Sequence, residues 1–346
     1  MSDVAVVDLD RPRRGDGPTI RARPLVRVEN LAKYFPIQRG FFARTSFLHA
    51  VDGVSLHVRR AETLGLVGES GCGKSTLGRT ILRLFEPTYG RIVFDGKELV
   101  PMKAKDLRAL RRRMQIVFQD PYGSLNPKMR VGSTVAEGLR IHKLAASAAA
   151  EKARVEELLE RVGLRADAAS RYPHEFSAGQ RQRIGIARAL STSPDFIVCD
   201  EPLSALDVSI QAQMINLFKD LQSDLGIAYL FISHDLRAVE YMSHRVAVMY
   251  LGKIVETAKT ADLFERRHHP YTRALLSAVP SHQPGRRRLR MVLEGEAPSP
   301  LDPPPGCPFH PRCPRAEKGK CDKEMPPLEE LVSGSGHEVA CFFPET

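Results

Sequence analysis

The segment 68–76 combines glycines with a lysine and hydroxyl side chains, a composition that suits phosphate binding. It reads Gly-Glu-Ser-Gly-Cys-Gly-Lys-Ser-Thr and fits the pattern G-x-x-x-x-G-K-[ST]. Glycines let backbone N–H groups approach phosphates, while the lysine and the hydroxyl can neutralise phosphate charge and bind Mg²⁺. We therefore expect Lys74 to contact the β and γ phosphates and Ser75 to bind Mg²⁺. The residues predicted to bind a nucleotide here are Gly68, Ser70, Gly71, Cys72, Gly73, Lys74, Ser75 and Thr76.

A pair of carboxylates follows a short apolar run later in the chain. Phe196–Cys199 predicts a buried strand, and Asp200 and Glu201 come directly after it. A carboxylate at the end of such a strand can hold a metal ion, directly or through water. The next carboxylate can orient an attacking water as a general base. We expect Asp200 to serve the Mg²⁺ ion and Glu201 to serve as the base.

Short buried strands and amphipathic helices must position these residues. Thr63–Val67 is a compact apolar run that leads into the phosphate loop, and Ala228–Ile232 and Val246–Met249 predict two more buried strands. Apolar residues at 155, 158, 159 and 162 fall on one face of a helix, so the middle of the chain is predicted to be helical. Strands that alternate with helices predict a mostly parallel α/β core.

Further motifs give the chain a family resemblance. The sequence Phe-Ser-Ala-Gly-Gln at 176–180 resembles the signature of ATP-binding cassette (ABC) proteins. Gln119 matches the Q-loop glutamine of that family, Ser-Ala-Leu-Asp at 204–207 resembles its D-loop, and His234 matches its switch histidine. The six motifs occur in family order across 68–234. The resemblance implies an ABC ATPase cassette, with a parallel-sheet RecA-like core, antiparallel strands and a helical subdomain.

The resemblance also implies that ATP is hydrolysed between two paired cassettes. In this family two cassettes bind head to tail around two ATP molecules, and closing and opening the pair drives transport. The residues that would then act on ATP held by the partner are Ser177, Ala178, Gly179, Gln180 and Asp207. Position 178 is usually glycine in the family; we expect Ala178 to be tolerated, because a methyl group is small.

Other roles follow from the same resemblance. His234 would contact the γ-phosphate of the chain's own ATP, and Lys74 and Gln119 would join Glu201 and His234 as catalytic residues. Phe35 matches the aromatic residue that stacks on adenine, with Tyr34 as the alternative. The Mg²⁺ ligands implied are Ser75, Gln119 and Asp200.

The C-terminal part narrows the resemblance to importer ATPases. His-Pro-Tyr-Thr-Arg-Ala-Leu-Leu at 269–276 resembles the segment that follows the cassette in bacterial oligopeptide and dipeptide importers, most closely the second of their two ATPases. The implied partners are a homologous second ATPase in a heterodimer, two membrane permease subunits and an extracytoplasmic substrate-binding protein. The implied location is the cytoplasmic face of the inner membrane.

Four of the six cysteines lie near the C-terminus, in a proline-rich stretch. Their spacing fits neither the C-x₂-C pairs of zinc ribbons nor the tight ferredoxin run, and a cytoplasmic location disfavours disulfides. Four thiolates in such a segment suit a shared metal, and resemblance to the importer ATPases implies a [4Fe–4S] cluster. Zn²⁺ and free thiols are the alternatives, and His310 and His337 could substitute as ligands. The predicted cluster ligands are Cys307, Cys313, Cys321 and Cys341.

Composition is that of a globular chain with two parts. The 346 residues are 42% hydrophobic and 27% charged, with a net charge of +10, no run of about 20 apolar residues for a membrane span and no secretory signal. The net positive charge suits binding to nucleic acid or to an anionic membrane.

We predict a basic tail at 1–23, an ABC nucleotide-binding domain at 24–258 with its helical subdomain at about 120–190, and a small Cys-rich extension at 259–346.

Two other classes of protein compete with the importer ATPase. A soluble ABC ATPase of DNA repair or chromosome maintenance would suit the charge and the cysteines. It is disfavoured because only 102 positions separate Ser75 from Ser177, which leaves no room for a coiled-coil insertion, and we expect no nucleic-acid partner. A non-catalytic scaffold cassette is disfavoured by the presence of Glu201 and His234.

Overall fold

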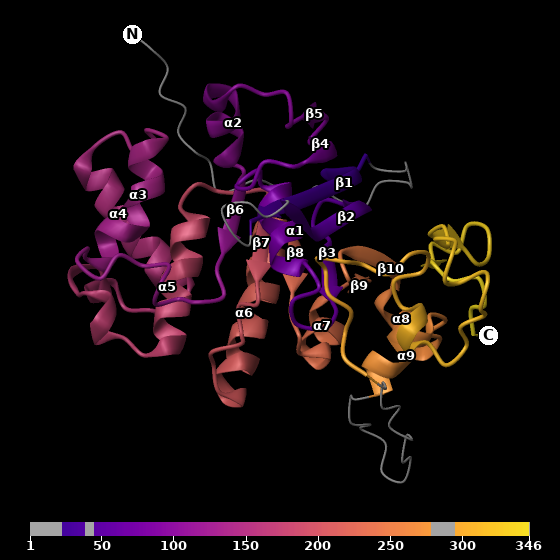
Figure 1. Ribbon diagram of the computed structural model, residues 1–346. Helices are drawn as coiled ribbons and strands as arrows, with labels where there is room; N and C mark the ends of the chain where they lie inside the picture. The colour runs from indigo at the N-terminus through magenta and orange to yellow at the C-terminus, as the bar shows by residue number, and fades with distance from the viewer. Residues whose placement is uncertain (1–22, 39–44, 278–294, 346) are drawn as a thin grey trace. The chain divides into compact units, whose positions relative to one another are not determined.

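The computed structural model describes residues 23–38, 45–277 and 295–345 (Figure 1). These residues form two compact units. Unit 1 comprises the described chain up to Leu25, Arg59–Glu62 and Pro101–Leu230, and unit 2 comprises Val26–Val58, Thr63–Val100 and the described chain from Phe231 onward. The predicted basic tail lies outside the described residues apart from its last residue, and the domain boundaries drawn from the sequence stay predictions.

Unit 2 contains two sets of strands. The antiparallel set has the order β2-β1-β4-β5, and the other has the order β11-β12-β10-β9-β3, in which β3 pairs parallel with β9. The bounds of the first set are β1 (Val26–Ile37), β2 (Ser46–Val58), β4 (Tyr89–Phe94) and β5 (Lys97–Glu98). Those of the second are β3 (Thr63–Val67), β9 (Arg245–Tyr250), β10 (Lys253–Lys259), β11 (Glu329–Glu330) and β12 (Glu338–Val339).

The helices of unit 2 are short, and the last of them lie next to the C-terminal segment.

A buried carboxylate, Glu256 on β10, accepts hydrogen bonds from the backbone N–H groups of His268 and His269 and pairs with His337 Nε2 at 2.7 Å. Burial opposes ionisation of Glu256, but these donors outweigh it and lower its pKa. The helices of unit 2 are α1 (Lys74–Ile81), α7 (Leu236–Met242), α8 (Thr260–Glu265), α9 (Pro270–Ser277) and the 3₁₀ turn η3 (His310–Arg312).

Unit 1 combines parallel strands with a group of packed helices. Strands β6 (Met114–Val117) and β7 (Phe196–Asp200) pair in parallel, and β8 (Ala228–Ile232) begins beside β7. Helices α3, α4 and α5 pack against one another (Figure 1). The helices are α2 (Ala104–Arg111), α3 (Val131–Ile141), α4 (Ala148–Arg161), α5 (Ala178–Leu190) and α6 (Val208–Leu225), with 3₁₀ turns η1 (Ala166–Ser170) and η2 (Pro173–Glu175).

The main strands and the central helix match the sequence predictions. Strands β3, β7 and β8 are buried at every residue, as continuous apolar runs require. Helix α4 buries Val155, Leu158 and Leu159 on one face. The strands β5, β6, β10, β11 and β12 were not predicted; β5, β11 and β12 are each two residues long, too short to carry an alternating pattern.

No helix within residues 23–38, 45–277 and 295–345 is both long and apolar enough to cross a bilayer.

Candidate nucleotide site

The phosphate loop in unit 2 has the geometry that its glycines predict. Gly73 has φ +109°, and a Cβ atom there would lie 1.9 Å from the Ala50 carbonyl oxygen, so no other residue fits. Lys74 is 4% exposed, and its Nζ donates to the carbonyl oxygens of Gly68 and Glu69 at 2.9 Å. The lysine is thereby held inside the curve of the loop, at the start of α1.

Cys72 lies inside the same loop. Its side chain is 7% exposed, burial raises its pKa, and Lys74 Nζ lies 3.9 Å from its sulfur. The Cys72 carbonyl accepts a hydrogen bond from the Gly252 N–H at 2.9 Å, which ties the loop to the turn after β9. This cysteine therefore belongs to the loop's packing, and it does not line the cavity that holds the C-terminal cysteines.

His234 follows β8, also in unit 2, and its ring is exposed. The next residue, Asp235, accepts hydrogen bonds from the N–H groups of Arg237 and Ala238 and so caps α7. Ser233 Oγ accepts from the Asp235 N–H at 3.0 Å. This capped turn fixes the backbone on both sides of His234.

Two predicted catalytic residues meet in unit 1. Gln119 Nε2 donates to Glu201 Oε2 at 3.0 Å, although the two lie 82 positions apart in the chain. Asp200, at the end of β7, is completely buried. Glu201 has φ +47°, a backbone conformation that is uncommon outside glycine and is often found at active sites. The chain turns sharply at Glu201, directly after the buried strand. Asp200 is therefore buried, whereas Glu201 is half-buried.

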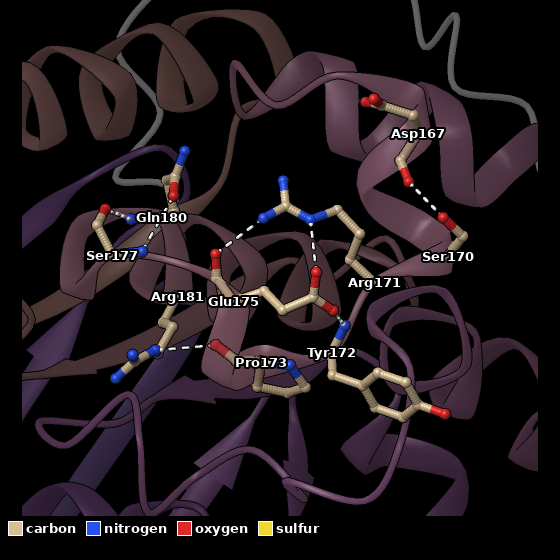
Figure 2. A network of polar contacts seen from close by, with 9 residues as sticks. All are labelled: Asp167, Ser170, Arg171, Tyr172, Pro173, Glu175, Ser177, Gln180 and Arg181. Atoms are coloured by element: carbon tan, nitrogen blue, oxygen red, sulfur yellow. Dashed lines mark hydrogen bonds and ion pairs between the residues drawn. The ribbon is translucent and has the colours of Figure 1, made fainter.

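The signature segment begins α5 through a reciprocal cap (Figure 2). Ser177 Oγ accepts from the Gln180 N–H at 3.3 Å, and Gln180 Oε1 accepts from the Ser177 N–H at 3.0 Å. Just upstream, Glu175 accepts from the Tyr172 N–H and from Arg171 Nε. The cap leaves the first N–H groups of α5 at a helix N-terminus, where the backbone favours an anion.

Positions 178 and 179 respond differently to a methyl group. Ala178 is exposed, so its methyl group meets solvent in this chain. Gly179 is buried, and a Cβ atom there would lie 2.7 Å from Ile210 Cγ2 on α6. A side chain at 179 would therefore have to displace Ile210 on the neighbouring helix, whereas 178 accepts a side chain.

Asp207 is the N-cap of α6. Its Oδ1 accepts from the Ile210 N–H at 3.0 Å and from Ser209 Oγ at 2.8 Å. The hydrogen bond from Ile210 is the main cause that lowers the pKa of Asp207. The D-loop residue is thus exposed and ionised at the start of a helix.

The two aromatic candidates for adenine stacking have different surroundings. Tyr34 stacks on His49 with ring centroids 4.1 Å apart, and its hydroxyl donates to Asp52. Phe35 is half-buried, meets Phe85 edge-on at 5.6 Å and has Lys33 Nζ over its ring at 4.9 Å. Each ring therefore has a neighbour over one face, His49 on Tyr34 and Lys33 on Phe35.

The four C-terminal cysteines line a single cavity. We call the segment 307–341 that carries them the cysteine lobe. Apolar walls come from Phe309, Phe342 and Phe343, and His269 also lines the cavity; burial lowers the pKa of His269 to about 4. Burial raises the pKa of Cys307 to about 11, and its three partner cysteines add to the rise. Within the described residues, no group of three or more His, Cys, Asp or Glu side chains is placed to hold a metal ion.

Sequence reasoning missed three residues that contact the phosphate loop or its neighbours. Arg312 of the cysteine lobe pairs with the Glu69 carboxylate, and Tyr271 on α9 accepts a hydrogen bond from the Glu69 N–H at 2.8 Å. Phe309 packs against Tyr271. Nothing in the local sequence links positions about 200 residues apart, so only the folded chain could reveal these contacts.

Residues 51–204 match the ABC transporter family, and residues 255–321 match the family described as oligopeptide/dipeptide transporter, C-terminal region. A putative peptide import ATP-binding protein of Brucella ovis is 52% identical over 320 residues, which cover 92% of this chain and 98% of that protein. The dipeptide transport ATP-binding protein DppF of Haemophilus influenzae is 49% identical, with 92% and 96% covered. The oligopeptide transport ATP-binding protein AppF of Bacillus subtilis is 50% identical, with the same shares covered.

Solved structures agree with these relatives. The ATP-binding cassette MJ0796, in a dimeric post-hydrolysis state bound to ADP and Pi, matches with a TM-score of 0.61 at 27% identity, covering 68% of this chain and 98% of that chain. CbiO1 from Clostridium perfringens, part of the ABC transporter complex CbiONQ, matches with a TM-score of 0.60 at 28% identity, covering 70% and 91%.

The chain belongs to the family of ABC transporter ATP-binding proteins, and it has the ABC ATPase cassette fold, with mixed sheets and helices. Its activity is ATP hydrolysis coupled to transport, as the sequence predicted. The alternative of a DNA-maintenance ATPase has no support among these relatives.

Proposed function

We propose that this chain is the ATP-hydrolysing subunit of an importer of dipeptides or oligopeptides. The observation that carries the proposal is sequence identity. About half of the residues are identical to those of proteins named for peptide import and for dipeptide and oligopeptide transport, over nearly their full length. The match of 255–321 to the C-terminal region of oligopeptide and dipeptide transporters supports the same class of cargo.

We propose that the phosphate loop and the strand-end carboxylates carry out the reaction. Lys74 neutralises the β and γ phosphates, Ser75, Gln119 and Asp200 hold Mg²⁺, and Glu201 takes the proton from the attacking water. Bound Mg²⁺ supplies charge neutralisation at the phosphates. The burial of Lys74 within the glycine loop and the Gln119–Glu201 hydrogen bond support this assignment.

The remaining ATP contacts are proposed from the same resemblance. His234 contacts the γ-phosphate of the chain's own nucleotide, and Phe35 stacks on adenine. The capped N-terminus of α5 acts on ATP bound by the partner cassette, together with the exposed Asp207. The residues proposed for this trans contact are Ser177, Ala178, Gly179, Gln180 and Asp207.

We propose that the assembly contains a homologous second ATPase, two permease subunits and an extracytoplasmic substrate-binding protein. The chain would bind at the cytoplasmic face of the inner membrane. The resemblance to importer ATPases supports these partners, and an ATP-binding subunit needs a separate channel to couple hydrolysis to transport. No nucleic-acid partner is proposed.

We also propose that residues 259–346 form a Cys-rich extension that holds a [4Fe–4S] cluster on Cys307, Cys313, Cys321 and Cys341. The fit is chemical: four thiols line one cavity with aromatic walls, and four cysteines are the ligand set of such clusters. Bound there, the cluster would cross-link the segment through its four thiolates. Zn²⁺ is the alternative occupant.

Peptide uptake tests the proposed function directly. Cells that lack this chain are supplied with a labelled tripeptide and complemented with the wild type, with Lys74→Ala or with the surface control Lys152→Ala. We expect uptake from the wild type and the control and none from Lys74→Ala. Unchanged tripeptide uptake in cells without the chain would reject the peptide cargo, and an ATPase rate stimulated by DNA would favour the DNA-maintenance class instead.

A further inference from the structure

A charged contact joins the cysteine lobe to the phosphate loop within unit 2. Arg312 Nη1 and Nη2 donate to Glu69 Oε2 and Oε1 at 2.9 and 3.2 Å. The two residues lie 243 positions apart. The Arg312 side chain is 8% exposed and that of Glu69 is 30% exposed. A bidentate arginine–carboxylate pair neutralises the carboxylate and also fixes its orientation. This contact therefore sets where the Glu69 carboxylate lies.

A second contact reaches the same residue through the backbone. Tyr271 accepts a hydrogen bond from the Glu69 N–H at 2.8 Å. Phe309, which is completely buried, packs against Tyr271 and Tyr250 with ring centroids 5.5 and 5.3 Å apart. Arg312 Nη1 also lies 3.4 Å from the Tyr250 hydroxyl. The cysteine lobe therefore contacts Glu69 in two ways. Arg312 pairs with the Glu69 side chain directly, and Phe309 packs against Tyr271, which accepts the hydrogen bond from the Glu69 N–H.

The charge of the Glu69 carboxylate affects how the loop can bind a nucleotide. Glu69 follows Gly68 directly, and its carbonyl oxygen accepts from Lys74 Nζ. An unpaired carboxylate in a loop that binds phosphates would repel them, and removing one partner of a poorly exposed pair leaves the other charge uncompensated. Arg312 cancels that charge and holds the carboxylate to one side.

We propose that Arg312 is a positioning residue of the nucleotide site, which it controls by pairing with Glu69. The proposal rests on the proposed role of the phosphate loop in binding ATP. Arg312 immediately precedes Cys313, one of the four cysteines that line the lobe's cavity. Any change that moves the backbone at Cys313 therefore alters the Arg312–Glu69 pair and, with it, the affinity for ATP.

Equilibrium binding of a fluorescent ATP analogue tests the proposal on the purified full chain. We expect Arg312→Ala to weaken binding about fivefold to tenfold, in the lower part of the range for coupled sites. Glu69→Gln removes the repelling charge and should bind at least as well as the wild type. The double variant Glu69→Gln/Arg312→Ala should match Glu69→Gln, because Arg312 then has no charge to cancel. Lys318→Ala, an exposed cation of the same lobe, is the matched control and should bind like the wild type.

The outcomes separate this proposal from the proposed function. If Arg312→Ala binds like the wild type while Lys74→Ala loses binding, the positioning role is rejected and the phosphate loop stands. If Lys74→Ala also binds normally, the assignment of the loop itself fails. Should Arg312→Ala not fold, the double variant decides: binding markedly weaker than that of Glu69→Gln would show that Arg312 does not act through Glu69.

The link to Cys313 has its own readout. Cys313→Ser should weaken binding of the analogue in the wild-type background and have no effect in the Glu69→Gln/Arg312→Ala background, since coupled residues are non-additive. Equal weakening in both backgrounds would reject transmission through the Arg312–Glu69 pair.

Discussion

Glu201 is the residue on which hydrolysis depends in the proposed mechanism, and its surroundings explain how it is held. The buried strand β7 delivers the chain to Asp200, and the left-handed backbone at Glu201 then turns its side chain toward Gln119. Because Gln119 Nε2 donates to the carboxylate, the base is oriented by an amide that carries no charge. In that mechanism, a shift of Gln119 would change both the proposed Mg²⁺ ligand set and the orientation of the proposed base.

Glu201→Gln should bind ATP and fail to hydrolyse it. The amide oxygen can still accept from Gln119 Nε2, so the local structure is kept while the base is lost. A positioned general base contributes about 10²–10⁴-fold, and the rate should fall by that factor. Phosphate release under saturating Mg-ATP measures it, with the exposed Glu240→Gln as control. A turnover near that of the wild type would remove Glu201 from its assigned role.

At the scale of elements, α5 and α6 fix the start of the signature helix. Gly179 packs under Ile210 on α6, and Ser177 and Gln180 cap the first turn. The two helices therefore set where the N–H groups of the signature point. Ala178 lies on the exposed side of the same turn, so its methyl group does not disturb this packing.

Gly179→Ala should impair hydrolysis by displacing the first turn of α5. Its new Cβ atom would meet Ile210 Cγ2 at 2.7 Å, and overpacking of this kind costs about 1–3 kcal/mol. We expect the ATPase rate of the assembled pair to fall about tenfold, which corresponds to about 1.4 kcal/mol of lost transition-state stabilisation. The matched control Ala178→Gly should keep its rate.

Removing the obstructing side chain should rescue the variant. Ile210→Ala lacks the Cγ2 atom, so the double variant Gly179→Ala/Ile210→Ala should be more active than Gly179→Ala alone. Failure of the second change to restore activity would mean that the glycine serves the nucleotide directly rather than the packing of α6.

On the scale of the whole molecule, the C-terminal segment is tied to the cassette at several points of unit 2. Strand β12 pairs with β10, Glu256 binds His337, and Phe309 packs against Tyr250 and Tyr271. Such a turn-rich segment holds little regular structure of its own, so cross-links from a metal centre would stabilise it.

Anaerobically purified protein should contain iron and sulfide in equal amounts and show the visible absorbance of a [4Fe–4S] cluster. Cys313→Ser should lose this absorbance, because one of the four thiolates is gone, whereas the core cysteine variant Cys199→Ala should keep it. Zinc at one equivalent without iron would instead assign the cavity to Zn²⁺, and neither metal would leave the thiols free.

The sequence alone determined the features that depend on near neighbours. The glycine spacing of the phosphate loop, the buried runs of β3, β7 and β8 and the apolar face of α4 are local patterns, and each predicted the element that the structure contains. The order of motifs also determined the family, which the comparisons confirmed.

Only the tertiary structure decided which distant residues meet. The pairing of Gln119 with Glu201 and the contact of Arg312 with Glu69 both join positions far apart in the chain. Such contacts arise from the packing of elements whose patterns are set locally, and no single segment encodes them. The short strands β11 and β12 have the same origin, because they form only where β10 offers an edge.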